Sequence, residues 1–375
     1  MHRKIKCALL TGILSILCLP RAHAEPEIDL SKINLPEGFE VSLYADDVPN
    51  ARSLTMGDKG TLFVGTRSGD RTIYAVVDKN NDGKADKTYT IAEKLRSPNG
   101  VAFRDGALYV AEINRITRYD NIEDNLRKVP EPVVIYDKLP TEGHHGWKYL
   151  EFGPDGKLYF NVGAPCNVCD STDEDERFAT IMRINADGSD PEIYARGIRN
   201  SVGFDWHPDD GALWFTDNNP DDMGDDRPAC ELNRVTEQDQ HFGYPHCHGR
   251  GVEDPDFGGD TSCDDFVAPA LALGAHVAPL GIKFYTGTQF PEEYRKALFI
   301  AEHGSWNRSM PQGYRVNVVR PDKDGAIFGF EVFADGWLER GKAWGRPVDV
   351  LVLDDGSLLV SDDQLGVVYK FTYTG

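Results

Sequence analysis

The chain has 375 residues, 40 of them Lys or Arg and 61 Asp or Glu, which gives a formal net charge of −21 at pH 7. Nucleic acids and anionic membranes are therefore poor partners for this protein, because both need a basic protein face. A hydrophobic fraction of 40%, with 18 Phe and 15 Tyr, supplies enough apolar surface for a packed core and excludes a disordered acidic chain.

The first 24 residues have the pattern of a secretory signal peptide. Basic residues at positions 3, 4 and 6 precede an apolar run from Cys7 to Pro20, and Ala-His-Ala at 22–24 supplies a cleavage site. The run is shorter than the ~20 apolar residues that a membrane-spanning helix needs. We therefore predict no membrane span, and a mature chain of residues 25–375 that is periplasmic or secreted.

Five cysteines lie beyond this segment, and an exported protein meets an oxidising environment in which disulfides form. Cys166 and Cys169, three residues apart, are expected to form a local disulfide. One further pair is expected among Cys230, Cys247 and Cys263, and the sequence leaves open which two residues form it.

A ten-residue phrase recurs six times along the mature chain. Each copy combines a turn, usually Asp-Gly, with an alternating apolar strand, which indicates a β-hairpin because Gly tolerates the positive φ of the turn. Hairpins repeated about every 40–50 residues are typical of a β-propeller with one four-stranded blade per repeat. The copies read DKGTLFVGTR from Asp58, RDGALYVAEI from Arg104, PDGKLYFNVG from Pro154, DDGALWFTDN from Asp209, YRKALFIAEH from Tyr294 and DDGSLLVSDD from Asp354.

Six copies predict one all-β domain over residues 25–375, folded as a six-bladed β-propeller. The longest gap between copies, from Phe215 to Phe299, is rich in Asp, Gly, Pro and His. We expect this gap to form a long inserted loop region between blades four and five, on one face of the disc. Long loops on a rigid scaffold are where binding and catalytic sites are commonly built.

In chain order, the first candidate site is an acidic turn. Asp78, Asn80, Asp82 and Asp86 place oxygen-bearing side chains at positions 1, 3, 5 and 9 of a loop with Gly at position 6, as in the first part of an EF-hand-type Ca²⁺ loop. Position 12 is Tyr89 instead of the Glu that completes such a loop. We expect a structural Ca²⁺ site on a hairpin; the alternative is a polar β-turn.

The second candidate is the sequence Gly-His-His-Gly at 143–146. His145, flanked by a Gly and leading into a strand, is a candidate general base because an accessible imidazole titrates near neutral pH. The alternative is a structural, hydrogen-bonded His pair.

Three later clusters are candidates for binding an anion or a cation. Arg199 and Asn200 combine a guanidinium fork for carboxylates with an amide that donates and accepts. The acidic loop 217–226 has the oxygen ligands that suit Ca²⁺, unless it is simply solvated. A last group could hold a flat anionic ligand, its alternative being surface arginines and a core indole; it comprises His303, Trp306, Arg308 and Arg346.

Together these residues resemble the soluble pyrroloquinoline quinone (PQQ)-dependent glucose/sorbosone dehydrogenase family of six-bladed propellers. The resemblance extends from Leu35 to Lys370, and its sorbosone and aldose sugar dehydrogenase branch is the more similar. The phrases that carry it are His145 eight residues before Gly153-Pro154-Asp155-Gly156, Arg199-Asn200, Glu231-Leu232-Asn233, His241-Phe242-Gly243-Tyr244-Pro245 and His303-Gly304-Ser305-Trp306-Asn307-Arg308.

The resemblance implies that PQQ lies over the propeller axis and that a sugar is oxidised at C1 by hydride transfer to it. His145 would be the base, with Arg199 at the reactive carbonyl region of the cofactor. An external acceptor, a cytochrome or a quinone, would take the electrons. The remaining cofactor contacts would come from Asn200, Trp306, Arg308 and Arg346, and backbone carbonyls at Asn219 and Pro220 would hold a Ca²⁺ ion.

The glucose branch of that family has an Asp directly before the catalytic His, whereas this chain has His144, so the group that orients His145 is left open. Two other functions remain as alternatives. A Ca²⁺-dependent sugar lactonase on a similar propeller would need a central metal ringed by carboxylate and Asn side chains. A non-enzymatic binding platform would take up no cofactor and would not need His145.

Overall fold

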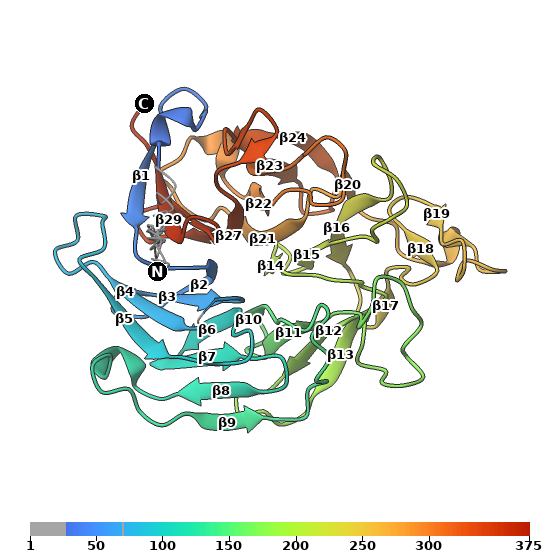
Figure 1. The fold of residues 1–375 in the computed structure, drawn as a ribbon, viewed down its shortest axis with the longest axis horizontal. Coiled ribbons are helices and arrows are strands. Elements are labelled where there is room, and N and C mark those ends of the chain that lie inside the picture. The colour runs from blue at the N-terminus through green and yellow to red at the C-terminus, as the bar shows by residue number, and fades with distance from the viewer. Residues whose placement is uncertain (1–27, 70) are drawn as a thin grey trace, which may run out of the picture.

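The computed structural model describes residues 28–69 and 71–375. The predicted signal peptide at 1–24 lies outside these residues. Six sheets, each built on four antiparallel strands, are arranged around a central axis as the blades of a propeller, and one of them gains a fifth strand (Figure 1). The helices of the described ranges are short 3-10 turns: η1 (Leu30–Lys32), η2 (Ile122–Asp124), η3 (Cys263–Asp265) and η4 (Glu292–Tyr294). None of them is long and apolar enough to cross a membrane.

The first three blades follow one another along the chain, each with its first strand nearest the axis. Blade one consists of β2 (Ala51–Met56), β3 (Thr61–Thr66), β4 (Ile73–Val77) and β5 (Lys87–Ala92). Blade two consists of β6 (Gly100–Arg104), β7 (Ala107–Ala111), β8 (Ile116–Tyr119) and β9 (Val133–Tyr136). Blade three consists of β10 (Leu150–Phe152), β11 (Leu158–Val162), β12 (Thr180–Ile184) and β13 (Glu192–Arg196).

The last three blades complete the ring, and the final one is shared between the two ends of the chain. Blade four consists of β14 (Phe204–Trp206), β15 (Leu213–Asp217), β16 (Ala229–Val235) and β20 (Leu271–Ala275). Blade five consists of β21 (Pro279–Phe284), β22 (Leu298–Glu302), β23 (Arg315–Pro321) and β24 (Ile327–Ala334). Blade six consists of β27 (Pro347–Val352), β28 (Leu358–Asp362), β29 (Val367–Tyr373) and the N-terminal strand β1 (Phe39–Ala45), which pairs with β29.

The repeated phrase occupies the turn between the first and second strands of every blade, so the prediction of six blades is confirmed. Gly60, Gly106, Gly156, Gly211 and Gly356 all have positive φ at this turn, as the hairpin geometry requires. In blade five, the turn residue is Lys296, which also adopts a left-handed φ of 62°. The core lies between adjacent blades; Phe63 and Ile73 of blade one, for example, pack with Val101 and Leu108 of blade two.

The expected insertion between blades four and five is not found there. Only residues 276–278 separate β20 of blade four from β21 of blade five. The extra chain lies instead inside blade four, between β16 and β20. It includes β17 (Gln240–His241), which pairs in parallel with β13 of blade three, and the hairpin of β18 (Cys247–His248) and β19 (Val252–Glu253). The sequence analysis placed the end of blade four too early, because its last strand, β20 (LALGA), does not contain the repeated phrase.

A second small hairpin, of β25 (Leu338–Glu339) and β26 (Lys342–Ala343), links blade five to blade six. The disulfides are Cys166–Cys169, as expected, and Cys247–Cys263. Cys230 is the free, buried thiol, and burial raises its pKa to about 12.

Candidate functional site

A cavity of about 510 Å³ lies where the second strands of the blades end and the first strands begin. The last residue of the repeated phrase stands at this end of each second strand. In four blades that residue lines the cavity or borders a lining His: Arg67, Gly163, Asn218 and His303. The strand geometry that repeats from blade to blade thus brings the last residue of the phrase to the cavity or to its lining His in four of the blades.

His145 lies in the cavity wall, in the segment between β9 and β10. Its side chain is buried, and its Nδ1 atom is 2.9 Å from the carbonyl oxygen of Ala164, two residues after the end of β11. A carbonyl only accepts hydrogen bonds, so Nδ1 carries the proton and Nε2 keeps its lone pair. This carbonyl is the orienting partner that the sequence left open.

The backbone of His145 is held in a strained conformation, with φ at 47°. Gly163 makes this possible, because a Cβ atom at that position would lie 2.7 Å from the Cβ of His145. Burial lowers the pKa of His145 well below its ordinary value, and Arg199 and His144 lower it further. The imidazole is therefore neutral at physiological pH.

Arg199 and Asn200 are fixed by a single carboxylate. Asp217, the last residue of β15, accepts the backbone N–H groups of Arg199 at 2.8 Å and of Asn200 at 2.7 Å. Asp217 is buried, and burial together with the nearby Glu231 raises its pKa. The pair predicted from sequence is therefore brought into the cavity wall, where both side chains are almost fully buried.

The guanidinium of Arg199 is held by a residue inside the Cys166–Cys169 disulfide loop. Asn167 accepts from Arg199 through its backbone oxygen at 2.8 Å and through Oδ1 at 2.7 Å. Asn167 Oδ1 also accepts from the backbone N–H of Asp221, another residue of the cavity wall. Sequence reasoning did not find Asn167, because nothing local marks it as a partner of a residue 32 positions away.

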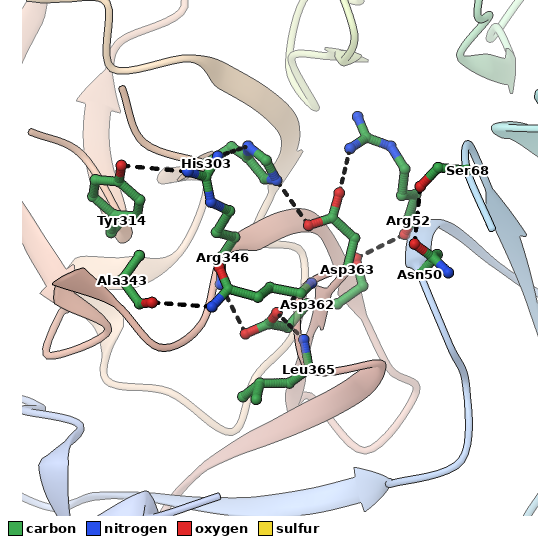
Figure 2. Close-up of polar contacts among 12 residues, drawn as sticks. Asn50, Arg52, Ser68, His303, Tyr314, Ala343, Arg346, Asp362, Asp363 and Leu365 are labelled. Carbon is green, nitrogen blue, oxygen red and sulfur yellow. Dashed lines mark hydrogen bonds and ion pairs between the residues drawn. The ribbon is translucent and has the colours of Figure 1, made fainter. Parts of the chain in front are cut away.

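On the other side of the cavity, a chain of polar contacts joins blades five, six and one (Figure 2). Asp363 accepts from Arg52 at 2.7 Å through Oδ2, and His303 Nε2 lies 2.8 Å from Oδ1. Arg346 Nη1 lies 3.3 Å from His303 Nδ1. Because the guanidinium only donates, His303 accepts through Nδ1 and donates to Asp363 through Nε2. The carboxylate thus orients two arginines that line the cavity.

Trp306 and Arg308, both predicted from the sequence to contact the ligand, differ in their distance from the cavity. Trp306 stands at the cavity rim with 73% of its surface exposed. Arg308 is not among the lining residues; it donates to the backbone oxygens of Asp225 and Met310 and to Asp226 Oδ1. Arg308 therefore holds the acidic loop 217–226 from the outside and does not reach the cavity.

The two predicted Ca²⁺ positions differ in their surroundings. Asn219 lines the cavity, next to the buried Pro220, and its side-chain amide donates to Glu231 and to the oxygen of Ala229. The turn that contains Asp78, Asn80, Asp82 and Asp86 is at the surface, with the carboxylates of Asp78 and Asp86 accepting its own backbone N–H groups. In residues 28–69 and 71–375, no three His, Cys, Asp or Glu side chains are arranged to hold a metal ion.

The cavity is basic in an otherwise acidic protein. Four arginines line it, and Asp221 is the one carboxylate among its described lining residues. Two buried polar atoms in the wall, Asn200 Oδ1 and Trp147 Nε1, have no hydrogen-bond partner in the described structure. An unpaired acceptor and an unpaired donor beside four guanidinium groups are what a polar, anionic ligand would satisfy.

The sequence profile of the TrAA12-like family matches residues 33–328. The chain belongs to this family. Over nearly its whole length, the TrAA12-like chain is also 35% identical to an uncharacterized protein of Borreliella burgdorferi, covering 92% of this chain and 91% of that protein. A PQQ-dependent sugar dehydrogenase of Hypocrea jecorina is 32% identical over a shorter stretch, covering 29% of this chain and 31% of that protein.

Solved structures confirm the fold of the TrAA12-like chain as that of PQQ-dependent sugar dehydrogenases. A calcium structure of the Trichoderma reesei family AA12 enzyme superposes with a TM-score of 0.79 at 21% identity, covering 91% of this chain and 97% of that one. The holo PQQ domain of pyranose dehydrogenase from Coprinopsis cinerea has a TM-score of 0.76 at 20% identity, covering 93% and 98%. PQQ-bound aldose sugar dehydrogenase from Streptomyces coelicolor has a TM-score of 0.64 at 20% identity, covering 90% and 99%.

Proposed function

We propose that this protein is an exported sugar dehydrogenase that oxidises an aldose or sugar aldehyde at C1 with PQQ and Ca²⁺ and passes the electrons to an external cytochrome or quinone. The observation that carries the proposal is the basic axial cavity with a neutral, oriented His145 in its wall. Related proteins described as PQQ-dependent sugar dehydrogenases support it.

The residues present fit such a cofactor. PQQ is a tricarboxylate o-quinone, so its carboxylates need cationic partners, which Arg52, Arg199 and Arg346 supply from the cavity wall. The unpaired Trp147 Nε1 is a donor for an anionic oxygen, and Trp306 is the indole at the rim. Arg308 would act indirectly, by holding the loop that contains Asp221.

The oxygen atoms for a Ca²⁺ ion are present on the same wall. The segment with Asn219 and Pro220 supplies backbone carbonyls, and Asn200 Oδ1 is a buried acceptor that no described donor uses. Oxygen-only coordination is what Ca²⁺ prefers. When bound, PQQ supplies a two-electron acceptor for the C1 hydride, and Ca²⁺ supplies a Lewis acid beside it.

His145 supplies the proton transfer. Its Nδ1–H donates to the carbonyl of Ala164, so Nε2 has a free lone pair. Nε2 is therefore the atom that takes the proton of the C1 hydroxyl group while the C1 hydrogen leaves as hydride. A neutral carbonyl replaces the carboxylate that would otherwise orient such a base. No anion then stabilises the imidazolium form, and the low pKa of His145 keeps the base unprotonated before substrate arrives.

The test is reconstitution of the apo-protein with PQQ and Ca²⁺, followed by dye reduction with a panel of aldoses. We expect saturable changes in the PQQ absorption spectrum, sugar-dependent dye reduction, and loss of both on chelation of Ca²⁺. A protein that binds no PQQ in this titration, or binds it and oxidises no sugar, is not the proposed dehydrogenase.

A further inference from the structure

Resting on the proposed function, we infer that the preferred substrates are anionic sugars, uronic acids above all, and that Arg67 is the residue that selects them. Arg67 follows β3 in blade one, and its guanidinium lies over the ring of Trp147, with Cζ 3.7 Å from the ring centroid. Both residues line the axial cavity.

Arg67 differs from the other three cavity arginines in its partners. Arg52 pairs with Asp363, Arg199 is held by Asn167 and Asn218, and Arg346 contacts His303. For Arg67, the described residues supply the Trp147 ring and no hydrogen bond or ion pair. Its planar fork is therefore free to take a carboxylate with two parallel hydrogen bonds.

The depth of the arginines separates a cofactor role from a substrate role. Arg52 and Arg199 are each 2% exposed at the floor of the cavity, whereas Arg67 is exposed at its rim. A ligand that fills the floor first meets the buried arginines, and the molecule that enters afterwards meets Arg67. Although part of the Arg67 side chain is exposed, desolvation in the cavity mouth and then the charge of Arg52 lower its pKa to about 10, so the group stays cationic at neutral pH and gains from a counter-anion.

Trp147 ties this rim position to the reaction site. The same indole whose face carries Arg67 makes an edge contact with the ring of His145, at 5.9 Å between centroids. In a pyranuronic acid the carbon that bears the carboxylate and the anomeric C1 are both bonded to the ring oxygen, so one molecule can place its carboxylate at Arg67 and its C1 at His145, on either side of Trp147. Oxidation of a uronic acid at C1 gives its lactone: the hydroxyl proton goes to His145 and the hydride with its two electrons to the quinone.

The experiment compares matched sugars that differ at C6 alone, with Arg67→Gln against wild type. Dye reduction by PQQ-loaded protein is measured with D-glucuronate and D-glucose, and with D-galacturonate and D-galactose. We expect wild type to prefer each uronate at least tenfold in kcat/KM. Arg67→Gln should lose that preference, because its kcat/KM for the uronates should fall at least tenfold more than its kcat/KM for the neutral sugars. Arg340→Gln, in the exposed β25–β26 turn, is the charge-matched control and should behave as wild type.

Two binding measurements accompany the kinetics. Titration with PQQ alone should give the same affinity for wild type and Arg67→Gln, and calorimetry with glucuronate should show a salt-sensitive signal in wild type that the variant lacks. Equal kcat/KM for uronates and neutral sugars, or a loss of PQQ affinity in Arg67→Gln, would overturn the inference while leaving the dehydrogenase proposal intact. If no sugar is oxidised, the dehydrogenase proposal fails, and uronate binding by calorimetry still decides the role of Arg67.

Discussion

The carboxylate of Asp363 lies 2.8 Å from Nε2 of His303, and its second oxygen lies 2.7 Å from the guanidinium of Arg52. One side chain thus connects the second strand of blade six with the first strand of blade one and the end of the second strand of blade five. Burial acts against ionisation of Asp363, but His303 and Arg52 outweigh it and lower the pKa of this carboxyl.

Replacing this carboxylate should cost stability. Asp363→Asn leaves the buried Arg52 guanidinium without its counter-charge and presents an N–H group to one of two donors, so we expect the free energy of unfolding to fall by about 2–3 kcal/mol. Urea denaturation measures it. Asp226→Asn is the matched control, because the Arg308–Asp226 pair has its carboxylate 90% exposed and should contribute less than about 1 kcal/mol. Equal losses in the two variants would contradict the role of Asp363.

The same carboxylate predicts an acid-dependent loss of stability. The pKa of Asp363 is lower in the folded protein than in the unfolded chain, so its contribution is complete above the unfolded value near ~4 and is lost as the pH falls further. The unfolding free energy of wild type should therefore fall more steeply than that of Asp363→Asn between pH 4 and pH 2. Parallel curves for the two proteins would exclude this titration.

His145 sets the expected pH dependence of turnover. The base works when neutral, and its pKa is held well below the ordinary 6.5, first by burial and then by Arg199. The acid limb of the kcat/KM profile should therefore lie below pH 6.5. His145→Ala should reduce kcat by at least about 100-fold while PQQ still binds, since general-base catalysis contributes roughly 10²–10⁴-fold. Near-normal turnover in His145→Ala would remove this residue from the reaction.

A methyl group at Gly163 should displace this base. Gly163→Ala places a Cβ atom 2.7 Å from the Cβ and 2.8 Å from the carbonyl oxygen of His145, so the residue must shift. We expect kcat to fall by about 10–100-fold and the protein to lose about 1–3 kcal/mol of stability. Gly143→Ala is the stability control: an added Cβ there meets nothing within 4 Å and its φ is not positive. Wild-type turnover in Gly163→Ala would show that the position of His145 is not critical.

The two disulfides should separate affinity from stability. Cys166→Ser with Cys169→Ser frees the loop whose Asn167 holds Arg199, so we expect PQQ affinity to fall about tenfold, the loss of roughly one charged hydrogen bond. The Cys247–Cys263 disulfide crosslinks the extra chain between β16 and β20. Removing it should lower the melting temperature without changing the PQQ affinity. Identical affinity losses in both double variants would contradict the link through Asn167.

Much of the fold was predictable because the blade is a local unit. Each turn-plus-strand phrase carries its own hairpin chemistry, so six phrases gave six blades, and even Lys296 takes the left-handed turn without a Gly. The position of the extra chain between β16 and β20 was predicted wrongly. β20 belongs to blade four because it pairs with β16, and no local sequence pattern indicates that contact.

The site was predicted less completely, for a related reason. His145, Arg199 and Asn200 were found because each stands in a recognisable phrase, whereas Arg52, Arg67 and Asp363 come from the first and last blades and meet only when the ring closes. A signal was present: Arg67, His303 and Asp363 are each the tenth residue of a repeated phrase, the position that points to the axis. Arg308 was expected in the cavity because its sequence neighbours are there, yet its carboxylate and carbonyl partners draw it outward.

The closure of the ring by β1 and β29 bears on how a ligand acts on the whole molecule. Among the described residues no disulfide closes the ring: blade six is completed by hydrogen bonds between β1 and β29, and Arg52 meets Asp363 where blade one adjoins blade six. An anion that contacts Arg52 and Arg346 together therefore connects blade one to blade six from within. Ligand binding and closure of the ring are therefore linked equilibria. Each tenfold excess of ligand over its dissociation constant raises the free energy of ring opening by about 1.4 kcal/mol.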